Sequence, residues 1–170
     1  PCSSTDVRPA GPTPPEAPAS PAPGGVTRDL AVSAFVVWRD QVLLHRHPKL
    51  GMWLPPGGHV EPNEVPDDAA VREVREESGV EVELVGERAI DAPGPRQLVR
   101  PRGVQLERIA PGHEHVDLVY LARPVAGYGG GLGGEGAGFG WYDAGAAAGL
   151  DLSPELRAWV ALALRELASG

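Results

Sequence analysis

Three glutamates lie at a spacing that would let them hold one metal ion. Glu73, Glu76 and Glu77 stand at i, i+3 and i+4, and on an α-helix these positions share one edge. Repulsion among the carboxylates would destabilise such a helix, and residues 66–78 contain no lysine to relieve it. A divalent cation would resolve the conflict, and an all-carboxylate set favours Mg²⁺ or Mn²⁺ over Zn²⁺. The pattern therefore predicts a metal site that also binds phosphate oxygens.

The residues around these glutamates predict where their helix begins and ends. Pro66 suits the first helical position, and Gly79 can supply the left-handed residue that ends the helix. Arg72 falls one turn before Glu76, where a guanidinium can hold a carboxylate in one rotamer through paired hydrogen bonds. We therefore interpret Arg72 as an orienting residue.

The segment from residue 58 to residue 80 resembles the Nudix box, and no fixed position of that motif is missing. The matching residues are Gly58, Glu64, Arg72, Glu73, Val74, Glu76, Glu77, Gly79 and Val80. The resemblance implies an α/β fold, an α/β/α sandwich with a mixed β-sheet, over about residues 28–168. It also implies a Mg²⁺-dependent (or Mn²⁺-dependent) pyrophosphohydrolase. Such an enzyme cleaves the diphosphate linkage of a nucleoside diphosphate joined to another moiety, nucleoside di- and triphosphates and ADP-ribose-like compounds included.

The same resemblance implies roles for individual residues. Glu76 and Glu77 would be the core metal ligands, and the backbone of Gly58 would join them. Glu73 would be either a third metal ligand or the catalytic base that activates the water. Glu114, further along the chain, is a candidate for a remote catalytic base.

Arg72 and Glu64 are the remaining box residues with an implied role. Arg72 would act in catalysis by holding the carboxylates, and Glu64 would position Arg72 or a metal-bound water.

The alternative function is a Nudix-fold sensor that binds a nucleotide or sugar phosphate without turnover. It is disfavoured because such proteins usually lack box carboxylates, and here all are present.

Composition narrows the partners and the compartment. The 170-residue chain has a formal net charge of −8 and a pI near 5.1. That charge argues against a stable nucleic-acid partner, which would need a basic face, and favours a small nucleotide or nucleotide derivative. The single cysteine, Cys2, allows no internal disulfide, and no apolar run has the length of a membrane span. We expect a cytoplasmic protein, either a monomer or a homodimer.

Hydrophobic patterning predicts one domain preceded by a tail. Residues 1–27 are rich in Pro and Ala and are predicted to be disordered, and residues 28–170 form the domain. A final helix is expected to start at the cap Ser153, with an apolar stripe that packs on the sheet or, as a less favoured alternative, forms a dimer interface. A turn at Arg39 and Asp40 joins the first two strands into a hairpin. The predicted strands are 30–38, 41–47, 80–90, 115–123 and 139–143.

Basic side chains near the box are the predicted substrate contacts. His47 ends a predicted strand that leads to the site. A long loop, about residues 91–114, includes a strand-like stretch at 103–109 and is expected to shape specificity. The side chains of this loop predicted to meet a polyphosphate are Arg96, Arg100 and Arg102, with a purely solvating role as the alternative.

Two further patterns in the sequence could belong to a ligand-binding site. His113, His115 and Asp117 alternate along one predicted strand, which is compatible with zinc. No cysteine or helical histidine pair supports that interpretation, so contacts with a base or ribose, or an ordinary surface, are favoured. Residues 127–140 contain nine glycines but lack a strand-to-helix G-x-G-x-x-G context, and they are predicted to be a flexible connector instead of a phosphate cradle.

Overall fold

The structure, a computed structural model, describes residues 25–135 and 138–168. The tail predicted to be disordered lies outside the described residues except for its last three positions. The chain enters its first strand at Thr27, one residue before the predicted start of the domain.

A mixed eight-stranded sheet forms the centre of the fold. Its order is β3-β2-β1-β7-β5, with β4 paired to β1, β6 to β7 and β8 to β2. The strands are β1 Thr27–Trp38, β2 Gln41–Arg46, β3 Trp53–Leu54, β4 Gly57–His59, β5 Val82–Val85, β6 Gly103–Ala110, β7 His113–Pro124 and β8 Phe139–Tyr142. The predicted hairpin of β1 and β2 is confirmed, and Arg39 and Asp40 turn with φ of 48° and 59°.

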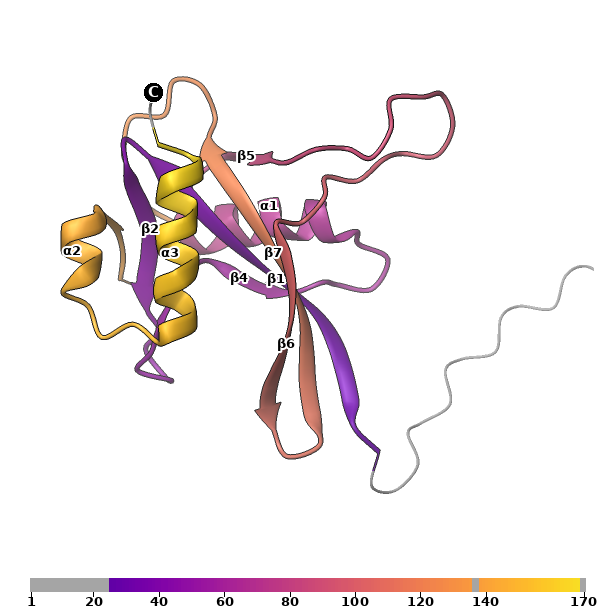
Figure 1. The fold of residues 1–170 in the computed structure, drawn as a ribbon, viewed down its shortest axis with the longest axis horizontal. Coiled ribbons are helices and arrows are strands. Elements are labelled where there is room, and N and C mark those ends of the chain that lie inside the picture. Colours follow the sequence, from indigo (N-terminus) through magenta and orange to yellow (C-terminus); the bar gives the residue numbers. More distant parts are fainter. Residues whose placement is uncertain (1–24, 136–137, 169–170) are drawn as a thin grey trace, which may run out of the picture.

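Two long strands carry the sheet, and each shares its outer edge between two short partners. β1 and β7 run parallel from the Thr27–His113 pair to the Val36–Ala122 pair. The other edge of β1 pairs first with β4 and then with β2, and that of β7 pairs first with β6 and then with β5. The sheet is therefore forked at both sides of its central pair (Figure 1).

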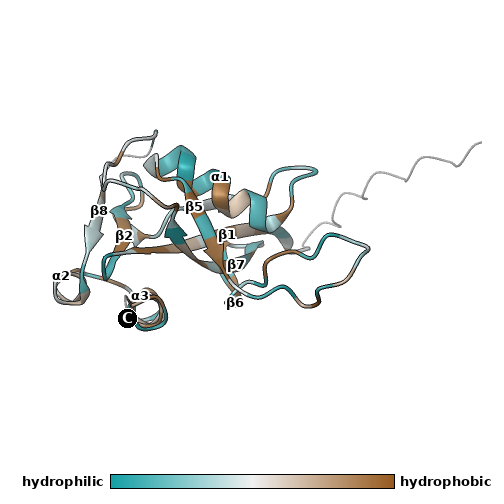
Figure 2. Cartoon of the chain, turned by 90° about the horizontal axis from the view of Figure 1, so that it is seen from above, coloured by the Kyte–Doolittle hydropathy of each residue, from teal (hydrophilic) through white to brown (hydrophobic). Residues whose placement is uncertain are grey.

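Helices cover both faces of the sheet, which confirms the predicted α/β/α sandwich. Helix α1 (Pro66–Ser78) lies on one face, and α2 (Ala144–Ala148) and α3 (Pro154–Glu166) lie on the other (Figures 1 and 2). Successive side chains of β1 point to opposite faces of the sheet, so this strand packs against both helical layers. Val36 packs with Val74 of α1, whereas Phe35 packs with Leu156 and Val160 of α3.

The apolar stripe of α3 packs on the sheet as predicted, and Ser153 caps the helix by accepting a hydrogen bond from the Leu156 N–H at 3.1 Å. Helix α2 was not predicted, because its Ala- and Gly-rich sequence has no amphipathic pattern. None of the helices in the described part of the chain is both long and apolar enough to cross a membrane.

The segment predicted as a loop, residues 91–114, is only partly irregular. Its second half is strand β6 and the turn into β7, so the strand-like stretch at 103–109 is a strand. Glu114 consequently lies within β7, not in a loop before it. The strand predicted at 80–90 is shorter than expected, because β5 ends at Val85. The irregular connection runs from residue 86 to residue 102.

The described part of the glycine-rich segment docks on the end of α1. The N–H of Gly133 donates to the carbonyl of Ser78 at 2.8 Å, and the N–H of Glu135 donates to the carbonyl of Glu76 at 2.7 Å. These bonds satisfy carbonyls that a helix end leaves without partners. At these positions the segment is thus a cap on the box helix and not a free connector.

Candidate active site

Helix α1 begins and ends where the sequence predicts. Pro66 occupies its first turn, and Gly79 adopts φ of 71° and donates its N–H to the Arg75 carbonyl. This geometry is the left-handed helix end that glycine favours. The helix therefore presents its carboxylate edge toward the short strand β4 and the loop that follows it.

Arg72 gathers three carboxylates of the box. Its guanidinium binds Glu64 through two hydrogen bonds of 2.8 and 2.9 Å, and donates to Glu73 at 2.9 Å and to Glu76 at 3.1 Å. It also donates to the carbonyl of His59 at 3.0 Å, which ties the helix to the end of β4. The hydrogen bond from Arg72 lowers the pKa of Glu64. Arg72 therefore has the contacts expected of an orienting residue.

Glu77 stands apart from this network. Its Oε2 accepts the Gly57 N–H at 3.1 Å. Burial raises the pKa of the Glu77 carboxyl to about 7, the Gly57 hydrogen bond acts in the opposite direction, and the charge of Glu73 adds to the rise. Glu77 is thus a half-buried carboxylate that forms no salt bridge within the described part of the chain.

Two glycines bring the backbone of β4 against these carboxylates. A Cβ atom at Gly57 would collide with the carbonyl of Val32, and one at Gly58 would lie 2.5 Å from a carboxylate oxygen of Glu73. Any side chain at these positions would displace the strand or the carboxylate. The pair of glycines thus explains how the main chain of β4 can approach the carboxylates of the box helix.

The residues present fit a divalent metal. Three carboxylates, those of Glu64, Glu73 and Glu76, share the guanidinium of Arg72, and a fourth, that of Glu77, accepts the Gly57 N–H beside them. The excess negative charge and the raised pKa of Glu77 are what a cation with oxygen ligands would relieve.

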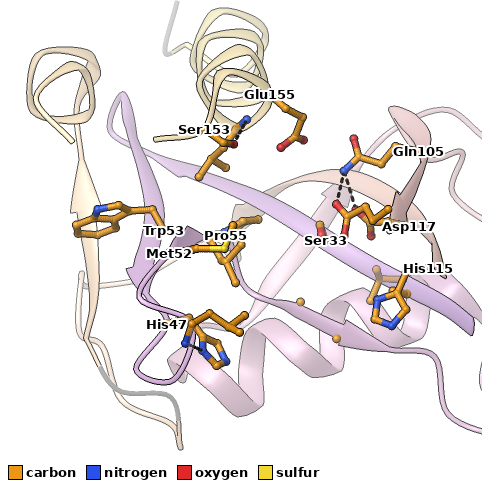
Figure 3. Close-up of a pocket in the computed structure, with 18 of the residues that line it drawn as sticks. Ser33, His47, Met52, Trp53, Pro55, Gln105, His115, Asp117, Ser153 and Glu155 are labelled. Carbon is orange, nitrogen blue, oxygen red and sulfur yellow. Dashed lines mark hydrogen bonds between the residues drawn. The ribbon is translucent and has the colours of Figure 1, made fainter. Parts of the chain in front are cut away.

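A cavity of about 660 Å³ opens beside the box and reaches across the sheet (Figure 3). Gly57, Gly58 and Glu77 line one part of it. An apolar wall is formed by Phe35, Leu50, Met52, Trp53 and Leu54. A polar wall carries Gln105, Glu107, His115, Asp117 and Glu155. This volume suits a small-molecule ligand.

Asp117 is the most unusual group of the polar wall. Burial, and then the charge of Glu107, raises the pKa of Asp117 to about 6, while Ser33 and Gln105 act in the opposite direction. Its Oδ2 accepts a hydrogen bond from the Gln105 amide at 3.2 Å, and its Oδ1 is buried without a hydrogen bond of normal geometry.

Sequence analysis named His115 and Asp117 of this wall as possible base or ribose contacts, and it missed Gln105, Glu107 and Glu155. The usable signal was a charged residue, Asp117, inside an otherwise apolar run of β7. Glu155 and Gln105 gave no signal, because they meet only when α3 folds over β6. His59 also lines the cavity, and in the sequence it is one more polar residue beside the box.

Of the residues predicted to contact substrate, His47 lines the cavity, whereas the three arginines lie elsewhere. Arg96 binds Asp67 and Asp68 at the start of α1, and Arg102 binds Glu166 of α3 at 2.7 Å. Arg100 is exposed, and it lines neither this cavity nor a smaller recess beside the turn between β6 and β7.

Glu114 is also separated from the box. Its carboxylate pairs with Arg28 at 2.9 Å and lines a smaller recess beside the turn between β6 and β7. The cavity that Glu77 enters does not include it.

Comparison with known proteins agrees with this architecture. The model of the NUDIX domain matches residues 27–163. A solved hydrolase of the NUDIX family from Clostridium perfringens has 32% sequence identity and a TM-score of 0.73, covering 84% of this chain and 99% of that one.

Curated relatives match over shorter stretches. Mouse diphosphoinositol polyphosphate phosphohydrolase 3-alpha is 54% identical over 48 residues, which is 26% of this chain and 28% of the relative. The bovine m7GpppN-mRNA hydrolase NUDT17 is 42% identical over 66 residues, or 35% of this chain and 22% of the relative. The chain thus spans less than a third of either curated relative. The family match, the 32% identical structure and the complete box around α1 lead to one conclusion: the chain belongs to the Nudix hydrolase family.

Proposed function

We propose that the protein is a metal-dependent pyrophosphohydrolase that cleaves the diphosphate linkage of a nucleoside diphosphate joined to another moiety. The observation that carries this proposal is the position of Glu77. This carboxylate belongs to the box helix on one face of the sheet, and it lines the cavity that α3 closes on the other face. Substrate held in the cavity would therefore meet the box at Glu77.

Glu73, Glu76, Glu77 and the carbonyl of Gly58 would hold Mg²⁺ or Mn²⁺. When bound, the metal would neutralise charge on the diphosphate and make its phosphorus more open to attack by water. Arg72 would keep Glu73 and Glu76 in fixed rotamers, which preserves the geometry that hydrolysis needs. Glu73 would accept the proton of the attacking water. Glu114 has no part in this proposal, because it is paired with Arg28 in a different recess.

The charge of the cavity indicates the substrate class. Arg108 is the one Lys or Arg among the described lining residues, whereas Glu77, Glu107, Asp117 and Glu155 are acidic. A substrate with many phosphates would be repelled here, which disfavours inositol polyphosphates and an RNA backbone. The apolar wall with Trp53 can instead accept a nucleobase or another planar group. A cytoplasmic location, expected from the single cysteine, completes the proposal.

Phosphate release across a panel of substrates tests the proposal. The panel contains nucleoside di- and triphosphates, nucleotide sugars, ADP-ribose and dinucleoside polyphosphates, each in Mg²⁺ and in Mn²⁺, with and without a coupling phosphatase. We expect selective, metal-dependent turnover. Glu77→Gln should lower kcat by at least about 100-fold, because it removes a charge at the metal without disturbing the core.

Glu83→Gln is the matched control, since Glu83 is an exposed carboxylate on β5. Its turnover should equal that of the wild type. Wild-type turnover in Glu77→Gln would refute the assignment. Binding without turnover across the whole panel would favour a nucleotide sensor instead.

A further inference from the structure

A second group of metal-ligating side chains lies outside the box carboxylates. Asp29 of β1, His59 of β4, and His113 and His115 of β7 each offer one ligand atom, and these atoms all lie within 4.8 Å of one another. Strand register brings them together. Asp29 lies opposite His115 in the parallel β1–β7 pair, and His59 pairs with β1 two residues further along.

The spacing of the ligand atoms suits a small tetrahedral site. The Nε2 atoms of His59 and His115 are 3.1 Å apart, and His113 Nε2 lies 3.7 Å from Asp29 Oδ2. In a tetrahedral zinc site with bonds of about 2.0–2.1 Å, neighbouring ligand atoms are about 3.3 Å apart. The rings also meet edge to face and do not stack: the planes of His59 and His115 are inclined by 75°, and those of His113 and His115 by 89°.

A hydroxyl group lies behind the ring of His113, at its Nδ1. Thr27 Oγ1 donates to the carbonyl of Gly112 at 3.2 Å and lies 3.0 Å from His113 Nδ1. With its own proton on the Gly112 carbonyl, Oγ1 can accept a second hydrogen bond from Nδ1–H, and this is the tautomer that leaves Nε2 unprotonated. The lone pair of His113 Nε2 then faces the other ligands. Such a partner behind a histidine is the usual outer contact of a metal-binding imidazole.

We propose that Asp29, His59, His113 and His115 bind one divalent transition-metal ion of the Zn²⁺ type. Three imidazoles and one carboxylate form a donor set that selects zinc-like ions over Mg²⁺, the opposite preference to that of the box. The bound ion joins β4 to β1 and β7 directly after Gly58, and His59 and His115 place it at the rim of the cavity. The site does not depend on the proposed hydrolysis, so either idea can fail alone.

Cobalt titration tests the site. Tag-free protein is stripped of metal and titrated with Co²⁺ in excess Mg²⁺, which saturates oxygen ligands but competes poorly for imidazoles. We expect one equivalent of Co²⁺ to produce the visible absorption of a tetrahedral complex. Zn²⁺ should displace it and raise the melting temperature of the protein.

Variants assign the ligands. His113→Gln, and independently His59→Gln, should weaken Co²⁺ binding by at least about 100-fold, and Thr27→Val by about 10- to 100-fold, whereas Thr27→Ser keeps the hydroxyl and the affinity. Glu77→Gln should bind Co²⁺ as the wild type does, and so should His47→Gln, which alters a histidine outside the cluster. Circular dichroism confirms that each variant is folded.

The alternatives are distinguishable. Absence of tetrahedral absorption in the wild-type protein refutes the site. So does an unchanged Co²⁺ affinity in both His113→Gln and His59→Gln. Loss of the absorption in Glu77→Gln would place the metal at the box carboxylates and would equally overturn the proposal.

Discussion

Gly134 offers a sharp test of the contact between the glycine-rich segment and the box helix. Its φ is +83°, and an added Cβ would lie 2.5 Å from the carbonyl oxygen of Glu76 and 2.7 Å from the carbonyl of Glu77. The obstacle is backbone, so it cannot move aside without moving the end of α1. Gly134→Ala therefore perturbs the backbone of Glu76 and Glu77, the two residues proposed as core metal ligands.

The expected cost can be estimated from these two effects. A left-handed conformation costs a residue with a Cβ about 1–2 kcal/mol. Overpacking against fixed atoms costs about 1–3 kcal/mol more. The free energy of unfolding should thus fall by about 2–5 kcal/mol, which in a domain of this size lowers the melting temperature by roughly 5–15 °C.

Gly131→Ala is the matched control. Gly131 is not among the glycines with a positive φ, and within the described residues no atom outside its immediate neighbours lies within 4 Å of an added Cβ. Both substitutions restrict the unfolded chain to the same extent, so the difference between the two variants isolates the native-state effect. Urea unfolding gives that difference, and a Mg²⁺ titration of the remaining activity shows whether Glu76 and Glu77 have moved. Equal stability of the two variants would mean that Gly134 does not press on the helix.

Three further predictions concern single groups. Burial raises the pKa of Asp117 to about 6, above the usual aspartate value of about 3.9. The free energy of unfolding of the wild type should therefore fall as pH rises from about 4 through 6, and Asp117→Asn should escape this loss of up to about 3 kcal/mol. Urea unfolding at pH 4.5 and pH 8 checks it, and a difference independent of pH would contradict it. Asp67 is buried and paired with Arg96, so Asp67→Ala should lower the free energy of unfolding by about 2–4 kcal/mol. Asp68→Ala, which removes an exposed partner of the same arginine, should lower it by under about 1 kcal/mol. Equal losses of the two variants in urea unfolding would contradict the greater weight given to the buried aspartate. Gly58→Ala should displace the carboxylate of Glu73 and lower kcat at least about tenfold with little change in melting temperature; normal turnover would count against the close approach.

Local patterns in the sequence were sufficient for the box helix and the last helix. Pro66 and Gly79 mark the ends of α1 through backbone preferences that hold in any fold, and the apolar stripe of α3 has one side that must be buried. Glu73, Glu76 and Glu77 lie on one helix, so their proximity follows from chain geometry alone. These features needed no knowledge of tertiary structure.

Contacts between segments that are far apart in the sequence could not be predicted. Arg96 is 28 residues from Asp68 and finds it only because the irregular segment folds back over the start of α1. His59 and His115 are 56 residues apart and meet through their separate pairings with β1. The predicted role for Arg96 rested on charge alone, and charge does not say which of several nearby carboxylates will be its partner.

The forked sheet has a consequence for how such an enzyme can change over time. Glu77 lies on α1, which packs on one face of the sheet, whereas Phe35 and Leu156 of the cavity wall pack in the cluster that α3 forms on the other face. The buried side of α1 packs through Val74 in a separate cluster, so substitutions in one layer should have effects nearly additive with those in the other. A lineage could therefore exchange the shape of the wall, and with it the molecule that is accepted, while inheriting the hydrolytic apparatus unaltered.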